Sequence, residues 1–272
     1  MSATAIENTV TAPALRVVPG TLRGAGRMVE RSILVYRRTW LIIVSGFFEP
    51  LFYLLSIRIG FGALVGDVQT PNGPVDYAVF VAPALMASSA MNGAVYDSTM
   101  NIFFKLKHAL LYETVLSTPL GPSAVAVGEI AWALMRGVLY STAFLACMAA
   151  LGMVISWWAL LALPACVLIG FAFASAGMAV TTYMRGWNDF EFIPAATLPM
   201  FVLSATFYPV SSYGGLSWVV QLSPLYHGVA LVRAACLGEG SWGLLGHVAV
   251  LAVMTVIGLR VASRRIGTLL LT

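Results

Sequence analysis

The stretch SAVAVGEIAWALMRGVLYSTAFLACMAA, residues 123–150, decides the class of fold. It carries two charged residues and is longer than the roughly 20 mostly apolar residues that an α-helix needs to cross a bilayer. A second stretch, WWALLALPACVLIGFAFASAGMAVTT at 157–182, follows after a short connection and has no charge. Because lipid solvates apolar side chains directly, both stretches predict membrane-spanning helices.

The composition of the whole chain agrees with this reading. Its 272 residues are 60% hydrophobic and only 10% charged, with a mean hydropathy of +0.89. A soluble globular domain carries about 25% charged residues, and a disordered chain needs low hydrophobicity. Three widely spaced cysteines, Cys147, Cys166 and Cys236, indicate buried free thiols, not a disulfide framework. The sequence therefore predicts an all-α integral membrane protein.

Working outward from residues 123–150, apolar segments of spanning length recur along the chain. We expect six transmembrane helices, at about 40–63, 77–97, 123–150, 157–182, 193–209 and 243–263. The apolar stretch 214–237 is ambiguous, because Ser223-Pro224 breaks it. We expect two short re-entrant helices there, since a seventh span would place Arg264 and Arg265 on the outer side.

Basic residues set the orientation. With six spans and a cytoplasmic N-terminus, 12 of the 15 lysines and arginines face the cytoplasm. The other three are Arg58, Arg136 and Arg233. The positive-inside rule thus predicts a multi-pass protein of the plasma (inner) membrane with both termini cytoplasmic, because helical spans do not suit an outer-membrane barrel.

The N-terminal region is expected to lie outside the spans. Residues 1–13 are predicted to be disordered, and 14–38 to form an interfacial connector helix. Arg23, Arg27 and Arg31 recur every four residues and so share one helical face, where anionic lipid attracts them. An ordinary positive-inside flank gives the same topology. Residues 39–272 form one transmembrane domain.

Several catalytic and binding signatures are missing from the sequence. The chain has two lysines, in Lys105-Leu106-Lys107, and neither completes a nucleotide-binding P-loop. The three histidines are scattered, without metal-ligand spacing to cysteines or carboxylates, and no nucleophile elbow is present. We therefore expect no enzyme, no metal and no cofactor in this chain, and no nucleic-acid partner.

Charged residues inside the expected spans are the candidates for function. They are Glu49, Arg58, Asp97, Glu129 and Arg136. An unpaired charge at the bilayer centre costs from about 3 to over 10 kcal/mol, so these side chains should face protein or water. Glu129 lies two turns before Arg136, with Trp132 between them, about 10.5 Å along the axis. A water or another helix would have to bridge them. Either they fix helix packing or they line a polar track for a substrate headgroup.

The connection 98–122 is the longest cytoplasmic loop of this topology. Its apolar residues, at 103, 104, 106, 110, 111, 115 and 116, approximate a helical stripe. Such an amphipathic helix either docks into a cleft of a cytosolic partner or rests on the membrane. The second cytoplasmic loop, residues 185–191, is charged and aromatic and is a further candidate contact.

Four motifs follow one another along the chain. They are Glu49-Pro50-Leu51 followed by Gly60 and Gly62, ETVLSTPL at 113–120, Gly128-Glu129 with Trp132 and Arg136, and SPLYH at 223–227 with Arg233. In this order they resemble the ABC-2 type permeases, in particular nodulation protein J and daunorubicin-exporter membrane subunits, and the resemblance covers roughly residues 20–270.

The resemblance implies an exporter subunit. Such permeases pair with a second copy or a related permease and with two cytosolic ATPase subunits, which bind the ATP and Mg. Their substrates are amphiphiles: lipid-linked saccharides, lipooligosaccharides or hydrophobic drugs. Helix 103–118 looks like the coupling helix, with Lys105, Lys107, Leu110, Leu111, Glu113 and Leu116. The segment with Pro224, His227 and Arg233 looks re-entrant, and Glu49, Arg58, Asp97, Glu129, Trp132 and Arg136 are candidates for the substrate path.

The main alternative is an ATP-independent secondary transporter or channel, which six spans with buried charges also suit. It predicts an internal inverted repeat. The two halves of this chain differ in span length and charge placement, so the sequence favours the exporter. An intramembrane enzyme or a purely structural subunit are weaker alternatives.

Overall fold

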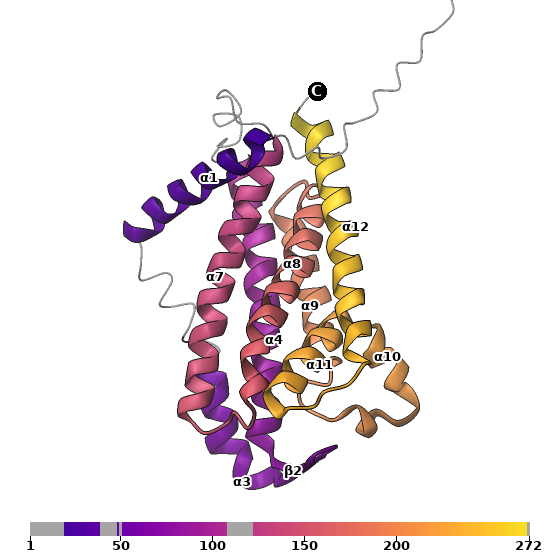
Figure 1. Cartoon of the computed structure of the whole chain (residues 1–272). Coiled ribbons are helices and arrows are strands. Elements are labelled where there is room, and N and C mark those ends of the chain that lie inside the picture. Colours follow the sequence, from indigo (N-terminus) through magenta and orange to yellow (C-terminus); the bar gives the residue numbers. More distant parts are fainter. Residues whose placement is uncertain (1–18, 39–47, 49–50, 108–121, 271–272) are drawn as a thin grey trace, which may run out of the picture.

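The computed structural model describes residues 19–38, 48, 51–107 and 122–270. These residues form a bundle of long helices with a β-hairpin at one end (Figure 1). We call the end with α1 and the last turns of α12 the α1 end, and the opposite end the hairpin end. The elements are α1 (Pro19–Arg38), η1 (Ile57–Phe61), α3 (Gly62–Val65), β1 (Asp67–Thr70), β2 (Gly73–Asp76), α4 (Tyr77–Tyr96), η2 (Asp97–Asn101), α5 (Ile102–Lys107), α7 (Pro122–Ala150), η3 (Trp157–Leu161), α8 (Ala162–Thr181), η4 (Trp187–Glu191), α9 (Phe192–Val202), η5 (Val210–Leu216), α10 (Ser217–Leu222), α11 (Pro224–Leu237) and α12 (Leu244–Leu270).

Four of the expected spans form helices that are long and apolar enough to cross a membrane. These helices are Tyr77–Lys105, Val127–Ala150, Trp157–Thr181 and Leu244–Ala262. They correspond to the second, third, fourth and sixth expected spans. Their exposed side chains are largely apolar, as expected for helices that face lipid.

The first and fifth expected spans differ from this pattern. Of the first, the structure describes a shorter apolar helix, Leu51–Phe61, and most of the remainder lies outside the described residues. The fifth was expected over 193–209, but α9 ends at Val202, three residues after the internal Pro199. Ala205 then takes a positive φ of 57°, which a helix does not accommodate. Six complete spans therefore stay a prediction.

The second span is longer than expected. We expected a connection from residue 98, but α4, η2 and α5 follow one another without a break from Tyr77 to Lys107. Residues 98–107 thus continue the span, and this part of the expected loop was wrong. Apolar spacing at 103, 104 and 106 fits a continued helix as well as it fits a separate one. Residues 108–121 lie outside the described part of the chain.

The stretch 214–237 divides as the sequence indicates. Helix α10 ends at Leu222, Ser223 is extended, and Pro224 begins α11 at a position where its missing N–H costs nothing. Gly238 closes α11 in the left-handed conformation, with φ 74°. How deeply these two helices enter the membrane stays a prediction.

The β-hairpin was not expected. Strands β1 and β2 pair antiparallel, with Asp67 opposite Asp76 and Thr70 opposite Gly73. The turn Thr70-Pro71-Asn72-Gly73 has the usual turn chemistry, and Gly73 has a φ of 115° that glycine alone adopts readily. The Asn72 amide donates to the carbonyl of Leu237 at the end of α11, and the Asp76 carboxylate accepts from the first turn of α4.

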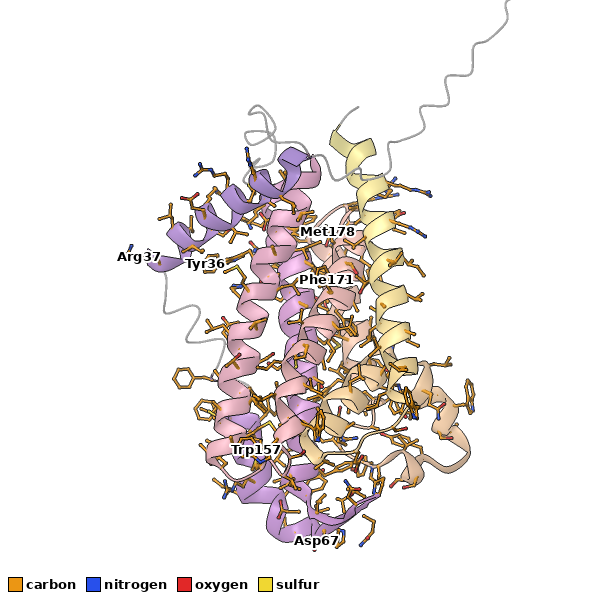
Figure 2. The ribbon with its side chains drawn as sticks, in the orientation of Figure 1. Tyr36, Arg37, Asp67, Trp157, Phe171 and Met178 are labelled. Carbon is orange, nitrogen blue, oxygen red and sulfur yellow. The ribbon has the colours of Figure 1, made fainter. Side chains whose placement is uncertain are left out.

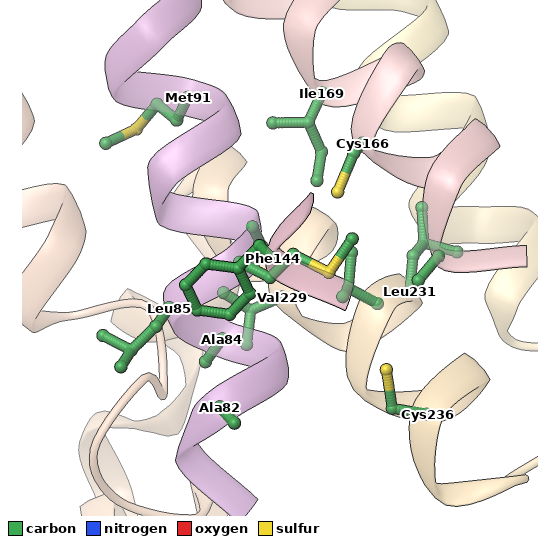
Figure 3. Packing of buried hydrophobic residues seen from close by; sticks show 14 of the residues in the cluster. Ala82, Ala84, Leu85, Met91, Phe144, Cys166, Ile169, Val229, Leu231 and Cys236 are labelled. Carbon is green, nitrogen blue, oxygen red and sulfur yellow. The ribbon is translucent and has the colours of Figure 1, made fainter. Parts of the chain in front are cut away.

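The main core lies between α4, α7, α8 and α11 (Figure 3). Phe144 of α7 and Ile169 of α8 pack there with small residues of α4 and with Val229 of α11. Cys166 and Cys236 are free thiols in the same core, as expected, and Cys147 is half-buried. These four helices therefore share one packed core.

Helix α1 crosses the start of α7 at the α1 end (Figure 1). A Cβ on Gly128 would lie 2.5 Å from the Cβ of Met28, so only glycine permits this crossing. Arg23, Arg27 and Arg31 are exposed on the side away from buried Met28. The three arginines thus share an exposed face, and the position of this helix at the membrane interface stays a prediction.

Candidate functional site

The buried charges of α7 are paired with the second span. The Lys105 ammonium donates to the Glu129 carboxylate at 2.6 Å, and the Arg136 guanidinium forms an ion pair with the Asp97 carboxylate. Glu129 and Arg136 are therefore not partners of each other. Each forms an ion pair with a residue of the neighbouring second span. All four side chains are largely buried, which makes their pairing necessary.

An aromatic side chain of α1 covers these ion pairs. The ring of Tyr36 lies 5.0 Å from that of Trp132 and 5.1 Å from the Arg136 guanidinium carbon. A guanidinium at this distance is attracted by the negative face of the ring. Tyr36 thus connects α1 to the ion pairs; Figure 2 shows it on the inner side of that helix. No local sequence pattern indicates this contact, because Tyr36 is about 100 residues from its partners.

A cavity of about 640 Å³ opens beside the Asp97–Arg136 pair. Its walls come from α4, α7, α9 and the helix that contains Tyr53. Half of its lining is apolar or glycine. The polar lining residues are Tyr53, Ser88, Ser89, Asn92, Tyr96, Asp97, Arg136, Tyr140, Ser141 and Thr197.

Three buried polar atoms on one face of α7 have no hydrogen-bond partner among the described residues. They are Glu129 Oε1, Trp132 Nε1 and Arg136 Nε. An unpaired buried polar group costs about 1–3 kcal/mol, so this face retains capacity to bind water or a polar ligand. The four predicted residues Asp97, Glu129, Trp132 and Arg136 therefore lie together.

Of the two other predicted members of the buried charge network, the structure describes only Arg58, which lies elsewhere. Arg58 donates to the carbonyl of Leu151 at 2.8 Å, where it caps the C-terminal end of α7 at the hairpin end. It is exposed and does not line the cavity. Glu49 lies outside the described residues.

The predicted re-entrant residues gather at the hairpin end. Arg233 is partly buried, with its guanidinium carbon 3.9 Å from the centre of the Phe80 ring, and it donates to the carbonyls of Phe80, Ala205 and Thr206. His227 Nε2 donates to the Gln221 carbonyl, which leaves its Nδ1 to accept from the Nδ1–H of His247 at 2.7 Å. Arg233 thus connects α11 to α4, and His227 connects α11 to α12. Neither residue lines the cavity.

The predicted coupling residues are only partly described. Lys105 forms the ion pair with Glu129, and Lys107 is the last residue of α5. Leu110, Leu111, Glu113 and Leu116 lie outside the described part of the chain. Phe103 packs edge-on against Trp187 and Phe190, so the second loop lies directly beside α5. Within residues 19–38, 51–107 and 122–270, no three His, Cys, Asp or Glu side chains could share a metal ion.

Long apolar helices around a polar cavity with buried ion pairs define a membrane transport component. Residues 25–237 match the family model described as ABC-2 type transporter, and the chain belongs to this family. Its membrane component is not itself the ATPase, and the family normally functions with an ATPase subunit.

The chain is also similar to curated proteins named nodulation protein J. It is 32% identical to that of Sinorhizobium fredii over 235 residues, covering 82% of this chain and 88% of the relative. It is 31% identical to that of Rhizobium leguminosarum bv. viciae, covering 84% and 88%. For Bradyrhizobium diazoefficiens the identity is 29%, covering 89% and 92%.

Proposed function

We propose that this chain is the membrane subunit of an ATP-driven exporter that moves an amphiphile out of the cytoplasm. The cavity is the observation that supports this proposal most directly. Half of its lining residues are apolar or glycine, half are polar, and one buried ion pair lies in its wall. The family and the nodulation protein J relatives support a transport role. ATP and Mg bind to a partner ATPase, and a second copy or a related permease completes the assembly.

The orientation follows from the charges at the two ends. Arg23, Arg27, Arg31, Arg260 and Arg264 are exposed at the α1 end. Trp157 lies at the hairpin end (Figure 2) and is 94% exposed. Trp242, two residues before the first residue of α12, is 89% exposed. Positive charge favours the cytoplasmic side and tryptophan favours a membrane interface. We therefore assign the α1 end to the cytoplasm and the hairpin end to the outside of the plasma (inner) membrane.

The cavity favours a substrate with an uncharged polar head. The opposite charges of Asp97 and Arg136 offset each other, and these two are the charged residues among the described residues that line the cavity. Hydroxyl and amide groups of Ser88, Asn92 and Thr197 suit a head rich in hydroxyls, and tyrosine rings offer flat faces to sugar rings. Within the amphiphile class, a lipid-linked saccharide or a lipooligosaccharide fits this lining better than a strongly charged headgroup does.

The continuous helix Tyr77–Lys107 connects this cavity to the cytoplasmic end. The coupling residues implied by the family resemblance begin in its last turn and extend through 108–118. A displacement that the ATPase imposes there would act on the same helix that carries Asp97. This arrangement supports coupling between ATP hydrolysis and the cavity.

The test is co-purification of the chain with the ATPase encoded nearest to its gene, followed by reconstitution in liposomes. We expect a stable complex that exports a fluorescent lipid-linked saccharide only with ATP. Leu110→Asp with Leu111→Asp should leave membrane insertion intact but abolish substrate-stimulated ATP hydrolysis. Normal transport by that double variant would refute the coupling assignment.

A chain that moves solute without ATP or a partner would instead establish the secondary transporter or channel.

A further inference from the structure

The second span contains one π-helical turn, η2, between the two residues that pair with α7. Asp97 is the first residue of this turn, and Lys105 lies one turn beyond its end. Their partners on α7 are Arg136 and Glu129. Single π-helical turns within α-helices are rare and occur frequently at functional sites.

The spacing of the charges explains what the π-turn does. Asp97 and Lys105 are eight residues apart, but Glu129 and Arg136 are seven apart. At about 100° per residue, seven residues fall about 20° short of two full turns, whereas eight overshoot them by about 80°. A π-turn hydrogen-bonds one residue further along and so absorbs the additional residue. With Asp97 and Lys105 eight residues apart, both ion pairs can therefore form at once only while the π-turn is present.

Helix α8 holds the π-turn through Thr181. The Thr181 hydroxyl lies 2.9 Å from the carbonyl of Ser98, within the π-turn, and 2.8 Å from the carbonyl of Gly177, within its own helix. One hydroxyl hydrogen thus has two acceptors. When Ser98 moves away, the hydroxyl can donate to Gly177 instead, so release of the π-turn loses no net hydrogen bond.

Gly177 provides the space for this contact. A Cβ at this position would lie 2.1 Å from the Ser98 hydroxyl oxygen. Ser98 and Thr99 are buried against α8, and their own hydroxyls donate to the carbonyl of Val95. The π-turn is therefore enclosed by protein on the side of α8 and carries Asp97 on the side of the cavity.

We propose that this π-turn is the register switch that couples the cytoplasmic end to the cavity, and that Thr181 is its positioning residue. When the cytoplasmic end of α5 is displaced, the turn relaxes to α-helix and the residues beyond it rotate by about 100° relative to Asp97. Lys105 then separates from Glu129, while Asp97 stays with Arg136. This opens the polar face of α7 from the cytoplasmic side. The inference rests on the proposed exporter function.

A one-residue deletion distinguishes a π-turn that relaxes during transport from one that only sets the register of the helix. Deleting Met100 removes the additional residue together with the π-turn, so Asp97 and Lys105 become seven apart on a regular helix. Both ion pairs keep their partners, and the protein should fold and bind the ATPase like the wild type. Without a turn that can relax, we expect ATP-dependent export to fall at least tenfold while ATP hydrolysis continues.

Thr181→Val provides a second test that does not alter the length of the helix. It removes the hydroxyl at nearly constant volume, and Thr181→Ser keeps it. Thr182→Val is the matched control, because the Thr182 hydroxyl donates only within α8, to Ala179. We expect Thr181→Val to raise the ATP hydrolysed per molecule exported by severalfold, whereas Thr181→Ser and Thr182→Val keep the wild-type ratio.

The readout is this coupling ratio in liposomes, with the melting temperature measured in parallel. Wild-type export by the Met100 deletion would show that the π-turn only sets the register and would overturn the switch. Should the deletion not fold, equal ratios for Thr181→Val and Thr182→Val overturn it as well. If the wild-type chain transports without an ATPase, both the proposed function and this inference are overturned. If the wild type couples transport to ATP hydrolysis but the variants behave like it, only this inference is overturned.

Discussion

Arg136 is buried and Arg233 is partly buried, and the protein pairs these two arginines in different ways. Arg233 donates to three backbone carbonyls and lies on the Phe80 ring, and all of these groups belong to the packed body of the bundle. Arg136 relies on a side-chain carboxylate and on a ring from α1, and it borders a cavity. Backbone carbonyls cannot move without the fold, whereas a carboxylate can change rotamer. From this comparison we propose a structural role for Arg233 and a role in transport for Arg136.

The largest effect should follow Arg233→Ala. It leaves the carbonyls of Phe80, Ala205 and Thr206 without their donor, at about 1–3 kcal/mol for each buried group. For a chain of this size, we expect the melting temperature in detergent to fall by roughly 10 °C. Arg233→Lys should recover part of the loss. An unchanged melting temperature for Arg233→Ala would break the comparison.

The Asp97–Arg136 pair should behave differently. Asp97→Ala leaves a buried guanidinium without its counter-charge, at a cost of about 3–5 kcal/mol, and Arg136→Ala does the same to the carboxylate. The double variant should regain most of the melting temperature and assemble with the ATPase, but not transport. Normal transport by the double variant would mean that the pair serves packing alone.

The aromatic rings that contact the two arginines, Phe80 and Tyr36, test the comparison further. Phe80→Leu and Tyr36→Leu each remove a cation–π contact of about 0.5–2 kcal/mol. The Phe80 ring is closer to its arginine and fully enclosed, so its loss should lower the melting temperature more. Tyr36→Leu should mainly change the transport rate. The reverse ranking of melting temperatures would contradict the structural role of the hairpin end.

The smallest effect concerns Glu239, which follows α11. Burial raises the pKa of this carboxyl, and the positive charge of Arg233 lowers it in part. Because the folded state holds the proton more tightly than the unfolded chain, the contribution to stability is present below the unfolded pKa of about 4.3. It is lost as the pH rises through the folded pKa. Glu239→Gln should flatten the melting temperature over that range, and an identical pH profile would exclude the effect.

The sequence predicted the four long helices and the break at Pro224, because both depend on local patterns of apolar residues and proline. It also selected Asp97, Glu129, Trp132 and Arg136 as candidates. It did not predict that Asp97 pairs with Arg136 and Lys105 with Glu129. This pairing depends on a π-turn, and nothing in the local sequence Asp97-Ser98-Thr99-Met100-Asn101 marks such a turn.

Other contacts were missed because they join distant residues. Tyr36 lies near Arg136 only because Gly128 lets α1 approach α7. The hairpin had a usable signal in Pro71-Asn72-Gly73, but its strands are shorter than the runs from which strands are usually recognised. Cavities likewise depend on the packing of several helices, so the sequence could identify candidate lining residues but not the space they enclose.

The length of the second span has a consequence for where force can be applied. Helix Tyr77–Lys105 has 29 residues and so extends about 44 Å, whereas the hydrocarbon core is about 30 Å thick. In the proposed orientation, with its N-terminal end held by the Asp76 cap and the hairpin outside, the other end of this helix would extend past the acyl chains into the headgroup layer. A cytosolic partner would then contact the helix without entering the hydrocarbon core, so the force of the proposed ATPase would be applied outside the acyl chains.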